Sequence, residues 1–587
     1  MFTHELPVLT ELMGQVSLPS DVVLGDRGLC DLELLLNGGF APLNRFMTLK
    51  DYGSVMENMT LEDGTTVFPL PVVLPVSADL CQPISGDAQN GGGAQSGAVV
   101  HIRNDTNALL ADLEVTSIFV PDLDKECRLV LNEQFPTSPT HPYAIYLKKL
   151  HQNCFYVGGR LVEKHPIVHF DYSRYRLTPT QARERLAERG WAGSTVGFQT
   201  RNPMHRSHYE LTVNALRQVE AKLGGRAHLM ITPAVGPTQP GDVDYRIRVR
   251  CYERILAHYR EEPLLVLLPL AMRMAGPREA LLHALVRRNY GCSYFIVGRD
   301  HAGPSCKTRT GEAFYDPYAA HALLEKHAAR IGIEPVFGKM MCYCGPELGY
   351  LQQDQVPAVG PDGTAVQVQN ISGTEFRRLL QNNASVPEWF CFPDVVDELR
   401  LEYKAPYLRG LCIYFTGLPC AGKSTLAQAL NALLLESRHD QRKVTVLDAD
   451  VIRTHLSKGL GFSRDDRSLN VRRIGYVAHE IVKHGGICLV ANIAPYKDDR
   501  KYNRQLIESG GGTYVEVYVS TPLEVCEKRD IKQLYNKARA GVIKQFTGIS
   551  DPYEAPDEPD LIINSSNNLA QRVAQVHQYL LEKQLTI

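Results

Sequence analysis

The stretch Gly417-Leu-Pro-Cys-Ala-Gly-Lys-Ser-Thr425 follows an apolar run, Leu411–Thr416, and opens a run with helical periodicity at 426–435. A strand, a glycine-rich loop and a helix in this order form the setting that a phosphate-binding loop requires. Its glycines let backbone N–H groups approach phosphate oxygens, a lysine reaches the outer phosphates, and a hydroxyl can ligate Mg²⁺. We therefore expect nucleotide phosphates to bind at Gly417, Gly422, Lys423, Ser424 and Thr425.

The size and composition of the chain indicate several globular domains. At about 150 residues per domain, 587 residues correspond to three to five domains. Hydrophobic residues make up 44% and charged residues 22%, with a formal charge of −2, so neither disorder nor a nucleic-acid partner is expected. The apolar runs, such as 264–271, are shorter than the roughly 18 residues that span a bilayer. We expect no membrane association and a cytoplasmic location, with the 14 cysteines mostly reduced and buried.

The pattern of apolar runs divides the chain into four parts and indicates a multidomain α/β protein. Residues 1–172 alternate short apolar runs with turn signals, which indicates a mainly β domain with a flexible surface loop at 85–97. Residues 173–330 alternate strands with helices, as in a Rossmann-like parallel sheet with ligands at its strand ends. We expect a small α/β domain at 331–404 and a phosphate-loop domain with a parallel sheet at 405–587.

A first ligand site is predicted at 194–208, which reads as strand, turn and helix. Asn202 can cap the helix and Pro203 suits its first position. His205 and His208, three residues apart, then share one helix face where the dipole favours phosphate. Two histidines at this spacing also occur on surfaces or as metal ligands, although the glutamate of the zinc-protease pattern is absent between them. A second apolar strand, from residue 294, ends in a charged loop at 298–304.

These segments, together with 38–43 and 371–378, make residues 1–400 resemble the ATP sulfurylase family. The resemblance implies that a sulfate oxygen attacks the α-phosphorus of ATP, which gives adenosine 5′-phosphosulfate (APS) and pyrophosphate without a side-chain nucleophile. By family analogy, sulfate is held by Gln199, Arg201 and the Ala302 backbone, and the catalytic turn is Thr200, Arg201 and Asn202. The leaving pyrophosphate would be stabilised by His205 and His208, and the nucleotide held by Gly298, Arg299, Asp300 and His301.

A second set of polar residues follows the phosphate loop. Asp448 and Asp450 end a strand-like run, and strict alternation would turn both carboxylates to one side, one for Mg²⁺ and one for a proton. The alternative is two acids in a helix-start turn. The segment 461–473, dense in arginine, suits an anionic nucleotide, with an aromatic ring for the base. A solvated basic face is the alternative there, and the basic segment 526–548 suggests a lid.

With the matching segments 528–530, 538–541 and 546–549, residues 408–587 resemble APS kinase. The resemblance implies transfer of the γ-phosphoryl group of ATP to the 3′-hydroxyl of APS, giving 3′-phosphoadenosine 5′-phosphosulfate (PAPS). Asp450 would be the base and Lys423 would steady the transferred group, while Ser424 and Asp448 would serve Mg²⁺, the only cofactor expected. APS would be held by Phe462, Arg467, Asn470 and Lys544.

Departures from the family patterns leave alternatives open. Alanine stands at 494, where many relatives carry a serine, so direct in-line phosphoryl transfer is expected. The order, sulfurylase first, is also that of fungal sulfurylases, whose C-terminal domain resembles a kinase but binds PAPS as a regulator. The main rival is therefore a sulfurylase with a PAPS-binding module, against which the intact loop and both aspartates argue. The first reaction could also run towards ATP. The family is usually oligomeric, so we expect a homo-oligomer.

Overall fold

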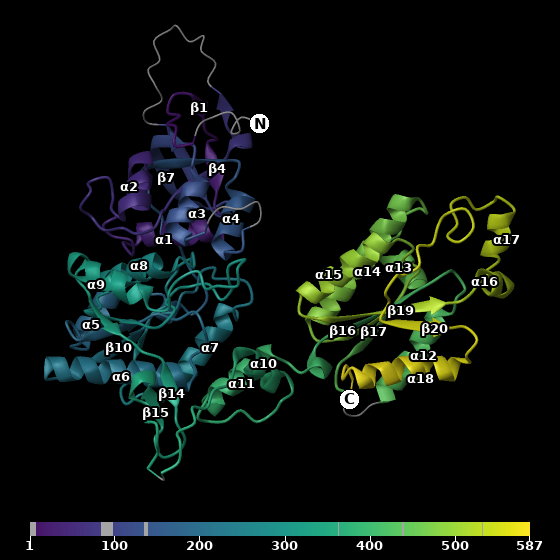
Figure 1. The fold of residues 1–587 in the computed structure, drawn as a ribbon. Helices are drawn as coiled ribbons and strands as arrows, with labels where there is room; N and C mark the ends of the chain where they lie inside the picture. The colour runs from purple at the N-terminus through teal and green to yellow at the C-terminus, as the bar shows by residue number, and fades with distance from the viewer. Residues whose placement is uncertain are drawn as a thin grey trace, which may run out of the picture. The chain divides into compact units, whose positions relative to one another are not determined.

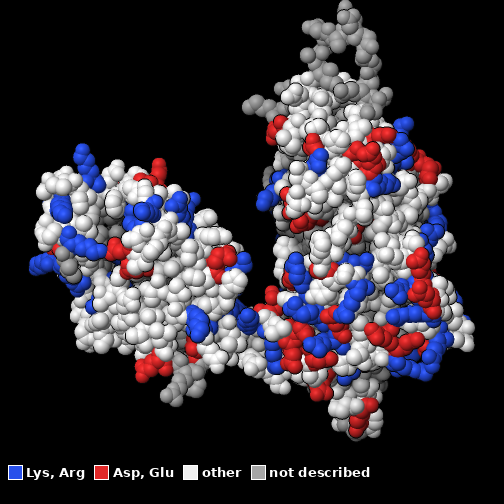
Figure 2. Space-filling model, turned by 180° about the vertical axis from the view of Figure 1, so that it is seen from behind, with Lys and Arg blue, Asp and Glu red and all other residues white. Residues whose placement is uncertain are grey.

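The computed structural model describes residues 8–83, 98–133, 139–361, 363–436, 440–530 and 532–586. The chain forms two compact units, one of Met1–Ser372 with Val386–Leu399 and one of Gly373–Ser385 with Arg400–Ile587 (Figure 1). The predicted loop at 85–97 lies outside the described residues. No helix of the described part combines the length and apolar character needed to cross a bilayer. On the face drawn in Figure 2, basic and acidic side chains lie interspersed over the first unit.

The first unit begins with a six-stranded sheet in the order β2-β6-β7-β8-β3, in which β4 also pairs with β8. The strands are β2 (Asp21–Val23), β3 (Arg45–Phe46), β4 (Leu74–Ser77), β6 (Val99–Arg103), β7 (Leu109–Phe119) and β8 (Cys154–Val162), beside a two-stranded ladder of β1 (Val16–Ser17) and β5 (Gln82–Pro83). Four helices accompany them, α1 (Asp26–Leu36), α2 (Leu49–Asn58), α3 (Leu123–Leu131) and α4 (Pro142–Leu150). The expected β-rich domain is confirmed, with helices that the short apolar runs did not predict.

A five-stranded parallel sheet follows in the order β11-β10-β9-β12-β13. Its strands are β9 (Thr195–Phe198), β10 (His228–Ile231), β11 (Leu264–Leu265), β12 (Tyr294–Val297) and β13 (Glu334–Phe337). The connecting helices are α5 (Pro179–Glu188), α6 (Arg206–Leu223), α7 (Tyr245–Leu256), α8 (Gly276–Asn289) and α9 (Ala319–Ile331). After β9 the chain adds β10 and β11 on one side of the sheet, and it then adds β12 and β13 on the other side. The direction in which strands are added therefore reverses between β9 and β12. Ligands bind at such a switch point, beyond the carboxyl ends of the strands.

Two details differ from the sequence predictions. The parallel sheet extends to β13, so the predicted division after residue 330 separates an edge strand from its partner β12. Helix α6 begins at Arg206 with His205 as its N-cap, not with Asn202 as cap and Pro203 at the first position. The reason is local, because the Thr200 hydroxyl bonds to the backbone of Asn202 and holds that segment in a turn.

The unit ends with a hairpin, β14 (Met341–Tyr343) and β15 (Tyr350–Gln352), and with most of α11 (Pro393–Glu402).

The second unit contains a parallel sheet in the order β17-β18-β16-β19-β20. Its strands are β16 (Leu411–Thr416), β17 (Val444–Asp448), β18 (Ile487–Ala491), β19 (Thr513–Ser520) and β20 (Leu561–Asn564). One face is covered by α14 (Arg464–Lys483) and α15 (Lys497–Ser509), and the other by α12 (Lys423–Glu436) and α18 (Leu569–Glu582) (Figure 1). The shorter helices are α10 (Gly373–Gln381), α13 (Ala449–His455), α16 (Leu523–Arg529) and α17 (Leu534–Arg539). The predicted strand, loop and helix around the phosphate loop are confirmed.

Alternation along β16 explains the two layers of this unit. Ile413 and Phe415 join the core beneath α12 and α18, whereas Cys412 and Tyr414 join the core beneath α14. Every residue of β16 is buried, and its sequence is accordingly a continuous run without charged residues, as is typical of central strands of parallel sheets. The phosphate loop therefore begins at the end of a strand that is packed on both faces.

Candidate active sites

The first site is built on the turn that follows β9. The Thr200 hydroxyl accepts a hydrogen bond from the Asn202 N–H at 3.1 Å and donates one to the Asn202 carbonyl at 3.0 Å. The same carbonyl accepts a bond from the Tyr252 hydroxyl at 2.8 Å, and the Thr200 carbonyl accepts one from the Ala234 N–H. The turn is thereby fixed to α7 and to the segment after β10, so the side chains it carries are held in place before any ligand binds.

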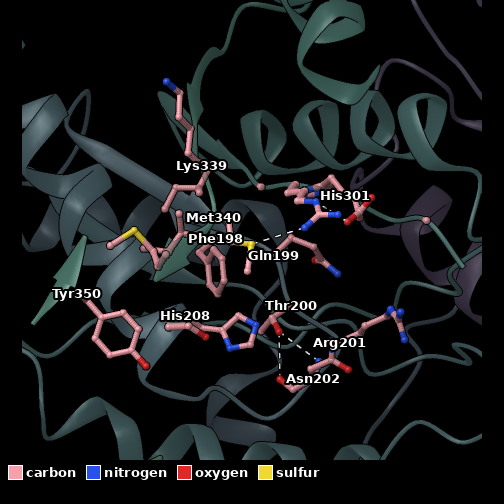
Figure 3. Close-up of a pocket in the computed structure, with 18 of the residues that line it drawn as sticks. Phe198, Gln199, Thr200, Arg201, Asn202, His208, His301, Lys339, Met340 and Tyr350 are labelled. Atoms are coloured by element: carbon pink, nitrogen blue, oxygen red, sulfur yellow. Dashed lines mark hydrogen bonds and ion pairs between the residues drawn. The ribbon is translucent and has the colours of Figure 1, made fainter. Parts of the chain in front are cut away.

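This turn lines a cavity of about 400 Å³ in the first unit, a size that suits a nucleotide (Figure 3). The structure brings most of the predicted residues to this one cavity: Gln199, Thr200, Arg201, Asn202, His208, Gly298, Arg299, Asp300, His301 and Ala302. The loop after β12 contributes the second half of this set. Asp300 and Ala302 have φ angles of 53° and 56°, in the left-handed region that non-glycine residues seldom occupy. Strain of this kind is characteristic of loops that hold a ligand.

The two predicted histidines differ in position. His208 lines the cavity, and its Nδ1 accepts a hydrogen bond from the His205 backbone N–H at 3.2 Å. Burial lowers the pKa of His208 to about 4, so the ring is neutral at pH 7 and carries its proton on Nε2, a hydrogen-bond donor. His205 is not among the lining residues; its ring stacks on Phe390 and its Nδ1 lies 3.4 Å from Cys391 Sγ. Burial lowers the pKa of His205 to about 3.

Gln199 and Arg201 present polar groups for an anion. Gln199 is buried, and its Nε2 lies 3.9 Å from Met272 Sδ, a weak acceptor, so this amide group can donate to an anion in the cavity. Arg201 Nη1 donates to both carboxylate oxygens of Asp242, at 2.6 and 2.7 Å. Its Nη2 lies 3.3 Å from Ser305 Oγ. The guanidinium is thus oriented by a carboxylate that sequence patterns did not single out, because Asp242 lies 41 residues away in a loop without a motif.

A buried row of titratable side chains lies behind His301. The carboxylate of Glu279 accepts the backbone N–H groups of Arg273 and Ala275. Burial raises the pKa of Glu279, but the neighbouring His283 and then these two N–H groups outweigh burial, so the pKa is lowered overall. His283 Nε2 lies 3.7 Å from this carboxylate, and His283 Nδ1 lies 3.1 Å from His301 Nε2. A proton on His283 Nε2 faces the anion, so Nδ1 is the acceptor and His301 Nε2 the donor. His301 is then left with Nδ1 as an acceptor.

Aromatic residues from the end of the first unit also line the cavity. The rings of Trp389 and Tyr343 stack in parallel with centroids 4.9 Å apart, and the Tyr350 hydroxyl donates to the Trp389 carbonyl at 2.7 Å. All three line the cavity. The aromatic run at 387–393 carries no sequence signal that it returns to the turn at 199–202.

The second site is built on the phosphate loop. Gly417 and Gly422 have φ angles of 148° and 101°, which side-chain-bearing residues adopt only with strain. Lys423 Nζ donates to the carbonyls of Gly417 and Leu418 at 2.9 and 2.8 Å, so the ammonium lies over the loop. Burial lowers the pKa of Lys423 to about 8, although the carboxylates of Asp448 and Asp450 act in the opposite direction. Both predicted aspartates therefore lie near the loop lysine.

The geometry predicted for the two aspartates is wrong. Asp448 is the N-cap of α13, its Oδ1 accepts the Asp450 N–H at 2.9 Å, and Asp450 lies in the first helical turn. The alternation of an extended strand does not apply, because an aspartate at the end of a strand readily caps a helix that starts there. The helix-start turn nevertheless keeps both carboxylates at the loop. Asp450 forms an ion pair with Lys532.

A cavity of about 630 Å³ adjoins Asp450. It gathers further residues predicted to hold a nucleotide: Phe462, Arg467, Asn470 and Lys544. Arg467 Nη1 is bound to Thr547 Oγ1 and Asp551 Oδ2, both at 2.6 Å, and the Arg453 guanidinium lies 4.3 Å from the Phe462 ring centroid. Asn470 Oδ1 and Asn492 Nδ2 are buried without partners among the described residues, and both asparagines line the cavity. Asn492 is a further polar contact for a ligand.

The residues present at the phosphate loop fit Mg²⁺. Among the described residues, no cluster of three or more His, Cys, Asp or Glu side chains could hold a metal by itself. Mg²⁺ commonly takes one or two protein oxygens and completes its shell with phosphates and water. Ser424, exposed in the first turn of α12, and Asp448 offer such oxygens beside the loop.

Comparisons with known proteins agree with this division into sites. Family models match residues 8–164 (PUA-like domain), 173–402 (ATP-sulfurylase) and 409–564 (Adenylylsulphate kinase). The sulfate adenylyltransferase of Emericella nidulans is 41% identical over 585 residues, 99% of this chain and 96% of the relative. That of Gibberella zeae is 42% identical with the same shares of both chains covered. Among solved structures, a hexameric APS kinase from Thiobacillus denitrificans is 29% identical, with a TM-score of 0.72 over 97% of this chain and 94% of that one.

Proposed function

The chain belongs to the sulfate adenylyltransferase family and carries an APS kinase domain, and we propose that it performs both steps of sulfate activation, forming APS and then PAPS. The observation that carries the proposal is the pairing, in one chain, of a ligand cavity at the β9/β12 switch point with an intact phosphate loop beside a second cavity. The ATP-sulfurylase and APS kinase domains mark the chain as a transferase that uses ATP.

In the first step, a sulfate oxygen attacks the α-phosphorus of ATP while the bond to the bridging oxygen of pyrophosphate breaks. We propose that Gln199, Arg201 and the Ala302 backbone hold sulfate, since all three line the cavity and the first two side chains carry N–H donors. His208 would donate from Nε2 to the charge that grows on pyrophosphate. His205 would act indirectly, because its backbone N–H donates to His208 Nδ1 and orients that ring. The nucleotide would be held by the loop Gly298–His301.

In the second step, the 3′-hydroxyl of APS attacks the γ-phosphorus of ATP and ADP leaves. We propose that Asp450 takes the hydroxyl proton and that Lys423 neutralises the transferred group, roles that their positions beside the loop support. Ser424 and Asp448 would hold Mg²⁺, which when bound neutralises phosphate charge. APS would occupy the cavity formed by Phe462, Arg467, Asn470 and Lys544.

The relatives that match over the full chain are named only for the first activity, so the rival to test is a C-terminal domain that binds PAPS as a regulator. The intact loop from Gly417 to Thr425 and the placement of Asp450 at the cavity support a kinase instead. The deciding experiment incubates the protein with APS, γ-labelled ATP and Mg²⁺, beside Lys423→Ala. Label in PAPS that the variant loses supports the kinase. Absence of label, with PAPS changing APS formation, would support the rival.

The direction of the first step, the assembly and the location belong to the same proposal. We propose formation of APS, because the kinase domain on the same chain consumes it. A homo-oligomer is proposed because the similar APS kinase is described as hexameric, and light scattering on the purified protein would measure it. A cytoplasmic location, where ATP is available, is proposed on the sequence alone.

A further inference from the structure

Two arginines flank the phosphate loop at the same glycine. Arg529 ends α16, and Arg572 lies in the first turn of α18. A methyl group added to Gly422 would lie 3.3 Å from Arg572 Nη1 and 3.8 Å from Arg529 Nη1. Both guanidinium groups therefore reach the backbone of the loop immediately before Lys423.

Among the residues that the structure describes, none carries a charge that is paired with either arginine. Arg529 Nη1 donates to the Ala421 carbonyl at 3.3 Å. Arg572 Nε is buried and has no hydrogen-bond partner in the part of the chain that the structure describes. Neither side chain forms an ion pair within that part. Burial, and then the charge of Arg529, lowers the pKa of Arg572, so the two cations repel each other at close range.

Other arginines of this domain show how unusual this arrangement is. Arg467 is paired with Asp551 at 2.6 Å, and Arg500 with Glu516 at 2.8 Å. Arg572 as a whole is half-buried, but its Nε is buried, and a buried N–H group normally has a carboxylate or carbonyl acceptor because leaving it unpaired is costly. The missing partner at Arg572 is therefore best supplied by an anionic ligand.

We propose that Arg572 is a binding residue for the triphosphate of ATP, acting with Arg529 above the phosphate loop. The proposal rests on the kinase function proposed above. A nucleoside triphosphate brings up to four negative charges to a loop that otherwise offers backbone N–H groups and Lys423. A guanidinium presents a planar fork of donors that matches phosphate oxygens. Arg572 lies beyond residue 564, where the match to the kinase family ends, so no motif marks it.

Two substitutions in the full chain distinguish the effect of the charge of Arg572 from the effect of its planar shape. Arg572→Gln keeps a polar side chain without charge, whereas Arg572→Lys keeps the charge without the fork. We expect Arg572→Gln to raise the KM for ATP in PAPS formation roughly tenfold or more, with the KM for APS and the thermal midpoint unchanged. Arg572→Lys should lose less. APS formation by the same preparations, and a Lys583→Gln variant at the far end of α18, serve as controls.

The outcomes separate this proposal from the one it rests on. An unchanged KM for ATP in Arg572→Gln would overturn it. So would equal losses in both variants together with altered preference between ATP and GTP, which would mean that Arg572 stacks on the base. If the unsubstituted protein makes no PAPS, the kinase function fails. In that case calorimetry with a non-hydrolysable ATP analogue still tests Arg572. Binding that remains in Lys423→Ala is subtracted, so that only binding at the phosphate loop is compared. Weaker binding in Arg572→Gln than in the unsubstituted protein supports the proposal, and equal binding overturns it.

Discussion

The guanidinium of Arg201 is held by the carboxylate of Asp242, with Nη1 2.6 and 2.7 Å from its two oxygens. Both side chains are largely buried, at 14% and 9% exposure, so solvent screens the pair only weakly. Arg201 lies in the turn after β9, and Asp242 lies in the loop before α7. The pair therefore fixes the position of a cation that lines the cavity and that we propose to hold sulfate.

The first prediction follows from this pair. Asp242→Asn removes the charge that orients Arg201 while keeping nearly the same shape, so the guanidinium loses its fixed position. We expect kcat/KM for APS formation to fall on the order of 10²-fold, since small misplacement of a positioning group costs that much. PAPS formation from added APS should be unchanged. Asp244→Asn, which removes an exposed carboxylate two residues along, is the matched control. Equal kinetics of Asp242→Asn and the unsubstituted protein would contradict the prediction.

The parts of both sites that sequence predicted are local in the chain. The phosphate loop was predicted with its strand and helix because nine consecutive residues carry the whole signal. The turn at 199–202 and the loop at 298–303 were likewise found as strand ends, and a parallel sheet brings such ends together. Asp242, which holds Arg201, and the lining residues His283 and Trp389 were missed, because each comes to the site only through the tertiary fold. No spacing in the sequence encodes that approach.

Errors arose where two local rules compete. The Asp448-Ala-Asp450 run satisfied a strand pattern, but an aspartate at a strand end can also cap a helix, and the cap is what forms. Asn202 and Pro203 fitted a helix start as well as His205 does. The Thr200 hydroxyl decides between them by closing a turn on Asn202. Side-chain to backbone bonds of this kind depend on geometry that residue types alone do not specify.

The second prediction concerns His283. If this side chain fixes the tautomer of His301, then His283→Leu should raise the KM for ATP in APS formation, because His301 no longer has an acceptor for its Nε2 proton. His283→Asn can place its Oδ1 near the former Nδ1 and should retain more activity. Steady-state kinetics with both variants checks this. Equal losses in the two, with equal thermal midpoints, would mean that His283 only fills space.

The third prediction concerns Asp450 and Asp448. Asp450→Asn removes the proposed proton acceptor at the cavity, so we expect kcat for PAPS formation to fall about 10²- to 10⁴-fold with little change in either KM. Asp448→Asn should instead raise the Mg²⁺ concentration needed for half-maximal rate, because one proposed metal ligand is weakened. APS formation by both variants should be unaffected.

These two variants are each other's control, since both remove one charge from α13 or its cap. The Asp448 variant also weakens a helix cap, so its thermal midpoint is measured alongside. Partial recovery of Asp448→Asn at high Mg²⁺, without recovery of Asp450→Asn, is the expected pattern. Recovery of both would show that Asp450 serves the metal and not the proton.

The last prediction is a pH dependence at Lys423. Burial lowers the pKa of this ammonium to about 8, well below the usual value near 10.4. Phosphate binds the charged form, so ATP binding requires proton uptake once the pH exceeds that value. The KM for ATP in PAPS formation should therefore be flat from about pH 6.5 to 7.5 and rise up to tenfold per pH unit above about 8. In Lys423→Arg the guanidinium stays charged, so any rise that remains in this variant comes from other groups. A flat profile to pH 9.5 in the unsubstituted protein, or the same rise in Lys423→Arg, would show that the lysine stays protonated throughout.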